Sequence, residues 1–425
     1  MLGSLVSDLL KLLGNLMQRK ILQIVKVLHP SRISGMSQYL LKDEAISGKF
    51  ILGATLLALV AANTALSSGY EHFWHTHLNV GLGSWSIDKD LRHWVDEGLM
   101  AIFFLVVGLE LKRELIQGEL RKFRTAILPF AAALGGMVVP AVIYLSFNMS
   151  SEAVNGWAIP MATDIAFAIG ILALIGKGIP PAIRLFLLTL AIVDDVGAII
   201  VIAVFYSQGI NVGLLIASAL LCALLFLAGR ARKLSMPIYV IGCIVLWLVV
   251  NASGIHASIA GAAMGLLAPL AIAGRGSKSI AERTEHAMIP ISTFIVVPLF
   301  AFANTGVVLS LSSFNNDSAL PIAAGIVLGL VVGKVVGIVG ASWLMIRFKF
   351  ADLPTGSSWT HIVGVGLLAG IGFTVSIFVT ELAFNQDEFI TVAKLSIIAA
   401  SAISGCLGLL VLKYKKRPRN NEVAR

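Results

Sequence analysis

Four ionisable side chains of this 425-residue sequence lie inside stretches that are otherwise apolar enough for hydrocarbon. Asp194 and Asp195 are adjacent in "LAIVDDVGAI", Asp164 stands in "IPMATDIAFAIG", and Lys334 stands in "LVVGKVVGIVG". Each charged residue at the centre of a membrane-spanning helix costs about 3 kcal/mol, so such residues usually line a polar pathway. A structural ion pair between Lys334 and one Asp is the simpler alternative, but three acids face this one base.

Asp194 and Asp195 therefore form a candidate proton acceptor. Burial and mutual repulsion disfavour two charged carboxylates side by side, which favours proton binding nearer to neutral pH. Hard cations such as Na⁺ prefer oxygen ligands, and the hydroxyl of Thr163 with water would add to the two carboxylates. A site that holds either protons or a small cation, but not both at once, exchanges them across a membrane if its access alternates.

Composition places these residues in an integral membrane protein. The chain is 57% hydrophobic and 13% charged, whereas soluble domains are about 25% charged. The net charge of +9 does not indicate nucleic-acid binding, because the Lys and Arg residues fall in short loops between apolar segments. The three cysteines show no metal or redox spacing, and no nucleotide-binding motif is present, so we expect no cofactor.

Apolar stretches of about 20 residues, the length that crosses a bilayer, predict an all-α membrane protein with twelve transmembrane helices. They lie near 48–66, 94–111, 126–147, 157–176, 183–206, 209–229, 236–254, 256–272, 287–308, 320–346, 359–384 and 390–412. Of the 32 Lys and Arg residues, only Lys89 and Arg92 then fall in external loops. Because basic residues concentrate in cytoplasmic loops, both termini are predicted to be cytoplasmic.

Two segments outside the predicted transporter domain, which spans residues 41–413, differ from it in composition. Residues 1–40 carry leucines at helical spacing with charges between them, which favours an amphipathic helix on the membrane surface. Residues 414–425 form a basic tail. Near 77–87, inside the domain, alternating apolar residues with two glycines predict a small external β-hairpin, whose open edge would suit a homodimer.

Two predicted helices contain residues that interrupt helical structure. Pro160 precedes Thr163 and Asp164 in one, and four glycines stand in "VGVGLLAGIGFT" in the other. Both helices are candidates to break at mid-membrane, which is tolerated where the backbone lines a cavity. Close helix packing is the alternative reason for the glycines. Asp164 could offset the positive ends of broken helices, and Lys334 the negative ends.

Five stretches, "GLELKREL", "ATDIAFAIG", "LAIVDDVGAI", "FAFANTGV" and "AGIGFTVSIF", together resemble the NhaA-type sodium/proton antiporters in order and across roughly residues 40–412. The resemblance implies inverted repeats, here the third to fifth and tenth to twelfth helices, and two discontinuous helices that cross at mid-membrane. It also implies a bacterial inner-membrane protein that exchanges cytoplasmic Na⁺ or Li⁺ for external protons, with pH regulation and net charge movement.

The resemblance also assigns roles to individual residues. It places cation and proton binding, and so the transported metal ion, on Asp194 and Asp195, with Asp195 the less dispensable. Thr163 and Asp164 would lie at the helix crossing, and Lys334 would pair with Asp194 or the helix ends. Further matches are the pH-regulation candidates Glu110, Glu114, Glu285 and His256, and Asp96 at the outer end of the second helix. The forty-residue N-terminal extension and Glu97, directly after Asp96, depart from the pattern.

Two other functions fit some of these residues. Intramembrane aspartyl proteases also use two Asp residues on neighbouring helices, and Asp164 and Asp194 lie on consecutive ones. That class has a G-x-G-D pattern, which is missing here, and gives no reason for Lys334. A carrier for an organic solute would call for aromatic residues near the carboxylates, where Ala, Ile, Gly and Val dominate. Apart from membrane lipid and the transported ions, only a second copy of the chain is an expected partner.

Overall fold

The computed structural model describes residues 44–82, 85–121, 123–207, 209–231, 233–270, 279–309, 314 and 316–414. All structural statements below concern these residues. The amphipathic helix predicted in residues 1–40 and nearly all of the basic tail lie outside them.

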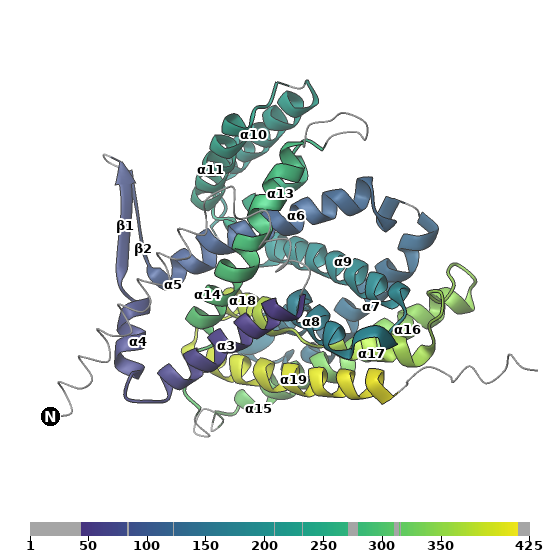
Figure 1. Ribbon diagram of the computed structural model, residues 1–425. Coiled ribbons are helices and arrows are strands. Elements are labelled where there is room, and N and C mark those ends of the chain that lie inside the picture. Colours follow the sequence, from purple (N-terminus) through teal and green to yellow (C-terminus); the bar gives the residue numbers. More distant parts are fainter. Residues whose placement is uncertain are drawn as a thin grey trace, which may run out of the picture.

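The described chain is mainly helical, and long helices pack side by side in one bundle (Figure 1). Seven stretches of described helix are long and apolar enough to cross a membrane, and two bent helix pairs meet the same test. The helices are α3 Glu44–Ala62, α4 Ser67–Trp74, α5 Leu91–His93, α6 Met100–Ile116, α7 Phe123–Asn148, α8 Ile165–Ile175, α9 Pro181–Phe205, α10 Val212–Arg230, α11 Met236–Ala252, α12 Ser258–Leu267, α13 Ile280–Ile291, α14 Val297–Asn304, α15 Ala319–Leu328, α16 Lys334–Arg347, α17 Trp359–Ala369, α18 Phe373–Ala383 and α19 Asp387–Tyr414. This confirms a multi-pass, predominantly α-helical membrane protein.

Several of these helices join through short segments of other helical geometry. Wider π-helical turns lie at η1 Trp94–Leu99, η5 Ser292–Val296 and η7 Gly329–Gly333, and tighter 3₁₀ segments at η2 Glu119–Arg121, η3 Glu152–Met161 and η4 Gly176–Gly178. The run from η3 to α8 and the run from α17 to α18 are both interrupted, and α17 and α18 are bent by 46° at their break. Both interruptions fall in the stretches where Pro160 and the glycines predicted them.

The glycines of η7 allow the segment before Lys334 to lie directly against α7. A Cβ atom on Gly333 would stand 3.0 Å from the backbone of Pro140, and one on Gly329 would stand 2.7 Å from the Pro160 ring. Side chains at these positions would push the helices apart. Close packing therefore explains part of the glycine content of this region, and it fixes where the Lys334 side chain begins.

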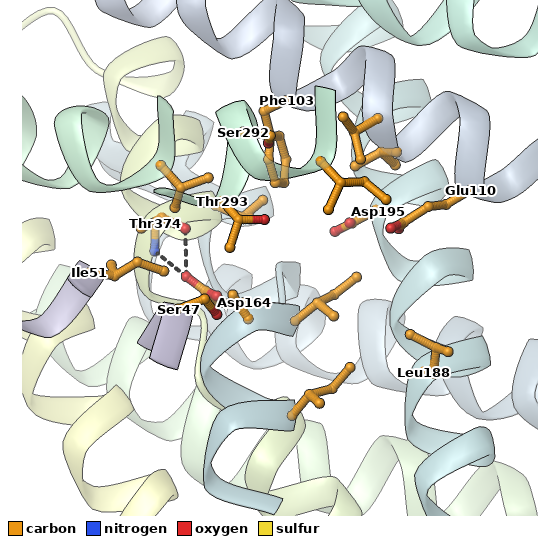
Figure 2. Close-up of a pocket in the computed structure, with 18 of the residues that line it drawn as sticks. Ser47, Ile51, Phe103, Glu110, Asp164, Leu188, Asp195, Ser292, Thr293 and Thr374 are labelled. Carbon is orange, nitrogen blue, oxygen red and sulfur yellow. Dashed lines mark hydrogen bonds between the residues drawn. The ribbon is translucent and has the colours of Figure 1, made fainter. Parts of the chain in front are cut away.

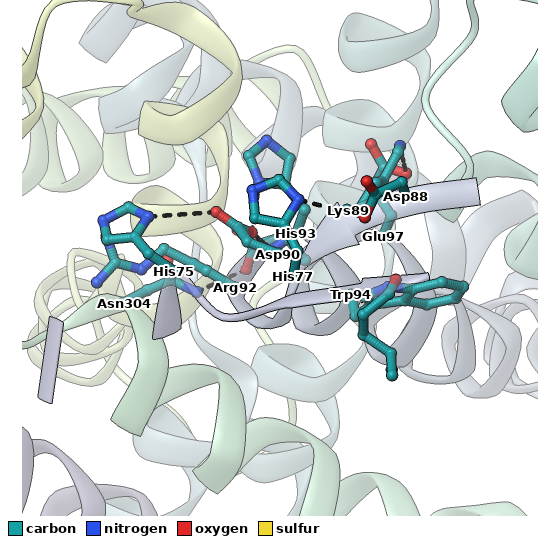
Figure 3. A network of polar contacts seen from close by, with 12 residues as sticks. His75, His77, Asp88, Lys89, Asp90, Arg92, His93, Trp94, Glu97 and Asn304 are labelled. Carbon is teal, nitrogen blue, oxygen red and sulfur yellow. Dashed lines mark hydrogen bonds and ion pairs between the residues drawn. The ribbon is translucent and has the colours of Figure 1, made fainter. Parts of the chain in front are cut away.

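A two-stranded antiparallel sheet, β1 His77–Leu82 with β2 Trp85–Asp90, projects from the bundle (Figure 1) and confirms the predicted hairpin. Asp90 fixes its base by accepting a hydrogen bond from the His93 backbone N–H at 2.8 Å, and the His93 ring lies 2.7 Å from the same carboxylate (Figure 3). Burial alone would raise the pKa of Asp90, but these bonds and the nearby imidazoles lower it overall.

The remaining apolar surface follows the outer faces of the bundle. α10 exposes Leu220 and Leu224 by 61% and 63%, and α10 and α11 stand together at one edge of the molecule (Figure 1). Contiguous exposed apolar surface of this kind is what a membrane protein presents to lipid. The ionisable side chains of Asp164, Asp194, Asp195 and Lys334 lie on the inside of the bundle.

Candidate ion-binding site

Asp194 and Asp195 lie in the middle of α9, and both are almost completely buried, with 1% and 2% exposure. Successive residues on an α-helix are about 100° apart around its axis, so adjacent side chains point in different directions. Only Asp195 of the two lines the cavity described below. The two carboxylates therefore have separate environments although they are neighbours in the chain.

Asp194 is paired with Lys334, the first residue of α16. The Lys334 ammonium donates to Asp194 Oδ2 at 2.7 Å and to the Thr163 hydroxyl at 2.9 Å. The Lys334 side chain is fully buried and that of Asp194 is 1% exposed, so bulk water does not screen this pair. In this structure Lys334 contacts a carboxylate and a hydroxyl rather than the carbonyl ends of the interrupted helices.

Asp164 connects the two interrupted segments. It is the N-cap of α8, where its Oδ1 accepts from the Phe167 backbone N–H at 3.1 Å. Its Oδ2 accepts from the backbone N–H of Thr374 at 3.2 Å and from the Thr374 hydroxyl at 2.5 Å, at the start of α18 (Figure 2). One carboxylate thus accepts hydrogen bonds at the positive starts of two helices.

Backbone contacts hold the same two segments together. The N–H of Asp164 donates to the carbonyl of Ile371 at 2.6 Å, and the Thr163 hydroxyl donates to the carbonyl of Ala369 at 2.9 Å. The Asp164 N–H and the carbonyls of Ala369 and Ile371 lie at helix interruptions, where backbone groups lack partners within their own helix. Because these bonds satisfy them, the interruptions are tolerated in an apolar environment.

A cavity of about 450 Å³ connects these groups with one end of the bundle. Asp195 of α9 and Glu110 of α6 project into it side by side, and Asp164 with Thr374 lies across from them (Figure 2). The other polar residues on its wall are Ser47, Arg113, Ser292 and Thr293. The buried Oδ2 of Asp195 has no hydrogen-bond partner, and within the described part of the chain no cationic side chain lies within 4 Å of this carboxylate. Asp195 is therefore a carboxylate open to a cavity and without a partner cation.

The acids expected to act in pH regulation lie in two places. Glu110 lines the cavity, and Glu285 of α13, 9% exposed, forms an ion pair of 2.5 Å with Arg113 of α6 at the cavity's open end. Glu114 is buried one helical turn beyond Glu110. His256 lies near the opposite end of α6, beside a second cavity. The structure therefore brings together the three glutamates but not the histidine.

Asp96 and Thr374 make two further polar contacts. Asp96 lies in η1, where its Oδ1 accepts a 2.6 Å hydrogen bond from the side chain of Asn304. Thr374, which donates twice to Asp164, was missed as a site residue in the sequence analysis. It belongs to the quoted stretch "AGIGFTVSIF", and a hydroxyl residue next to a predicted helix break was the available signal.

An interrupted helical bundle that holds buried carboxylates, the buried Lys334 ammonium and a cavity reached by Asp164 and Asp195 is typical of membrane-spanning ion carriers. The sequence model of the family described as Na⁺/H⁺ antiporter 1 matches residues 38–412. The chain belongs to that family, which confirms the resemblance read from its five sequence stretches.

Similar proteins agree with this assignment. The "Na(+)/H(+) antiporter NhaA 2" of Clostridium beijerinckii is 44% identical over 377 residues, which are 88% of this chain and 93% of that protein. The NhaA antiporter of Rhodospirillum rubrum is 44% identical over 388 residues, 89% of this chain and 96% of that protein. A solved structure of the sodium proton antiporter MjNhaP1 from Methanocaldococcus jannaschii aligns with 89% of this chain and 99% of its own length, at a TM-score of 0.44 and 14% identity.

Proposed function

We propose that this protein is a secondary transporter that exchanges Na⁺ or Li⁺ for protons, and that Asp195 is its principal ion-binding group. The observation that carries this proposal is the cavity-facing Asp195 carboxylate with an unpartnered buried oxygen. An isolated ionised carboxylate is very unfavourable in an apolar interior, so a proton or a cation must neutralise it. One carboxylate that needs either ion, but cannot hold both in the same place, couples their movements.

Asp194, Lys334 and Thr163 would serve this site in a different way. Because the Lys334 ammonium already balances Asp194, the Asp194–Asp195 pair carries one compensated and one uncompensated acid. An alkali cation at Asp195 could recruit Asp194 Oδ2 or the Thr163 hydroxyl oxygen only if Lys334 moved away or lost its proton, whereas Asp194 Oδ1 has no hydrogen-bond partner. Lys334 is thus a charge compensator, and its ammonium competes with the transported cation for the same oxygens.

The full topology belongs to the same proposal. It comprises twelve spans, inverted repeats and discontinuous helices that cross at mid-membrane. The helices found within every predicted span support the twelve spans. The contacts between residues 163–164 and 369–374 support the crossing. We further propose cytoplasmic termini in a bacterial inner membrane, so that the cavity with Glu110 and Glu285 faces the cytoplasm. The acids at that opening and His256 would adjust transport to pH, and the exchange would move net charge.

A homodimer through the hairpin is the last element of this proposal. In the described residues β1 and β2 pair only with each other, so each has an outer edge with unpaired backbone groups. Leu78 and Val80 are also 45% and 52% exposed. Exposed edges of this kind pair readily with another chain, and a second copy would cover them.

Flux measurements with Asp195→Asn test the ion-exchange proposal. The full chain is reconstituted in vesicles, and proton movement on addition of Na⁺ is followed with a pH dye between pH 6 and 9. We expect loss of sodium-dependent proton flux at every pH, because the asparagine amide neither titrates between pH 6 and 9 nor carries a negative charge that would bind Na⁺. Asp352→Asn, which changes an exposed acid between α16 and α17, is the matched control and should retain exchange. Undiminished exchange by Asp195→Asn would show that the coupling group lies elsewhere.

A further inference from the structure

The start of α18, which lines the cavity beside Asp164, has no capping side chain of its own. The helix begins at Phe373, and its N-cap is Gly372, which offers no side-chain hydrogen bond. A Cβ atom on Gly372 would stand 3.0 Å from the Cβ of Ser376 and 3.0 Å from Leu330 Cδ2, so a side chain there would crowd both residues. The first N–H groups of a helix need acceptors in an apolar interior. α18 must therefore take its acceptors from other segments.

Two other helices supply these acceptors. The backbone N–H of Phe373 donates to Ser401 Oγ of α19 at 3.2 Å, and the backbone N–H of Thr374 donates to Asp164 Oδ2, also at 3.2 Å. Ser401 is 7% exposed and Thr374 is 4% exposed, so both bonds lie inside the bundle. The positive start of α18 is thus divided between a neutral hydroxyl and a charged carboxylate.

The bond of Ser401 differs from the bonds of other buried hydroxyl residues in the bundle. Thr55, Thr380 and Ser396 each donate to the carbonyl four residues earlier in their own helix, a common arrangement for Ser and Thr in apolar helices. The Ser401 oxygen instead accepts from a residue 28 positions away on another helix. This bond fixes α18 relative to α19, which a bond within one helix does not do.

α19 passes the break between α17 and α18 as one helix of 28 residues (Figure 1). On the α17 side, a Cβ atom on Gly408 would stand 2.7 Å from Leu368 Cδ2, so the two helices are in close contact. At the break itself, a Cβ atom on Gly370 would stand 2.7 Å from Ser404 Oγ. Ser401, about one turn from Ser404, then contacts the start of α18. An uninterrupted helix therefore sets where α18 begins.

We infer that Ser401 is a positioning residue for cation binding, because its hydroxyl holds the first N–H of α18 and so leaves the Asp164 carboxylate to the cavity. This inference rests on the proposed exchange function and adds to it a residue that does not line the cavity. Without the hydroxyl, the Phe373 N–H loses its acceptor, and Asp164 is the anionic acceptor at this helix start. A further donor to that carboxylate would withdraw negative charge from the cavity and weaken its attraction for a cation.

The sodium dependence of exchange tests this role. The full chain is reconstituted in vesicles, and proton movement is followed over a range of Na⁺ concentrations, so that KM and kcat per folded protein are obtained separately. We expect Ser401→Ala to raise the KM for Na⁺ by about tenfold, which corresponds to one hydrogen bond of about 1.4 kcal/mol, and to change kcat by less than about twofold because Asp195 is intact. Ser401→Thr keeps the hydroxyl and should keep the KM.

Ser396→Ala is the matched control. It removes a hydroxyl from the same helix that is 4% exposed and donates to Val392 within that helix. Its KM for Na⁺ should equal that of the unaltered protein. Should Ser401→Ala not fold, Ser401→Cys replaces the hydroxyl by a group of similar shape that accepts hydrogen bonds only weakly, and the same outcomes decide.

The outcomes separate positioning from a purely structural role. A variant that only loosens the bundle lowers the amount of folded protein but leaves KM unchanged. An unchanged KM for Ser401→Ala, or an equal rise for Ser401→Thr or Ser396→Ala, would overturn the positioning role, while exchange by the unaltered protein would leave the proposed function intact. If the unaltered protein shows no exchange, the proposed function fails, and the inference fails with it.

Discussion

Replacement of Lys334 by methionine should destabilise the protein strongly, because it leaves Asp194 charged, buried and alone. The ammonium of Lys334 makes two hydrogen bonds, at 2.7 Å to Asp194 and 2.9 Å to Thr163, and both charged partners are at most 1% exposed. Removing one partner of a buried ion pair costs about 3–5 kcal/mol of unfolding free energy. The unpaired Thr163 oxygen adds about 1 kcal/mol, so a total near 5 kcal/mol is expected.

A double-mutant cycle in detergent micelles measures this quantity. Unfolding by increasing SDS is followed by circular dichroism for the unaltered chain, Lys334→Met, Asp194→Asn and the double variant. The double variant should recover at least about 2 kcal/mol relative to Lys334→Met, since neither buried charge remains. Lys394→Met is the matched control, because Lys394 also pairs with an acid, but its partner Glu381 is 20% exposed. Water there can solvate the remaining carboxylate, so the loss should be below about 2 kcal/mol.

The reasoning fails on either of two results. Lys334→Met could unfold at the same SDS fraction as the unaltered protein, which would mean that Asp194 has another source of neutralisation in the folded state. The double variant could also be no more stable than Lys334→Met, in which case the loss would come from packing of the lysine stem rather than from an unbalanced charge.

Three further predictions follow from single contacts. Thr374→Val should reduce the free energy of unfolding by about 1.5–3 kcal/mol, because it removes a hydroxyl that donates a hydrogen bond to the charged Asp164. Thr374→Ser keeps the hydroxyl and should be nearly neutral, so equal losses of the two variants in thermal unfolding would contradict this. Asp90→Asn should loosen the hairpin base at neutral pH but not in strong acid. A carboxyl with a lowered pKa stabilises the fold at pH values above its ordinary pKa of 3.8, and it loses this contribution as the pH falls through the lowered pKa. Hydrogen exchange of the His93 amide should therefore differ between the variant and the unaltered chain only at the higher pH. Val80→Lys places a charge on the exposed hairpin face, and light scattering should report a monomer; a persistent dimer would place the interface elsewhere.

The helices and the hairpin could be predicted from the sequence because their signals are local. Apolar runs of spanning length and alternating residues near 77–87 each depend on a short window. The first predicted span, 48–66, shows the limit of this approach, because α3 ends at Ala62 and α4 follows after a bend of 115°. Composition alone gives the length of an apolar run but not a change of direction within it.

Pairings between distant residues could be anticipated only in part. The excess of acids over bases indicated that Lys334 would be paired, but only the family resemblance named Asp194 as a partner, because the pairing depends on how α16 packs against α9. The link from Thr374 to Asp164 spans 210 positions and has no local pattern.

The bonds of Asp164 limit how α8 and α18 can move relative to each other. Its side chain and backbone bond to Phe167 within α8, to Ile371 and twice to Thr374, and the last three bonds join the start of α8 to the segment that leads into α18. Breaking several of these bonds without water would leave a buried carboxylate and helix ends unsatisfied, which is far more unfavourable than sliding packed helices. We therefore expect these starts to move as one unit.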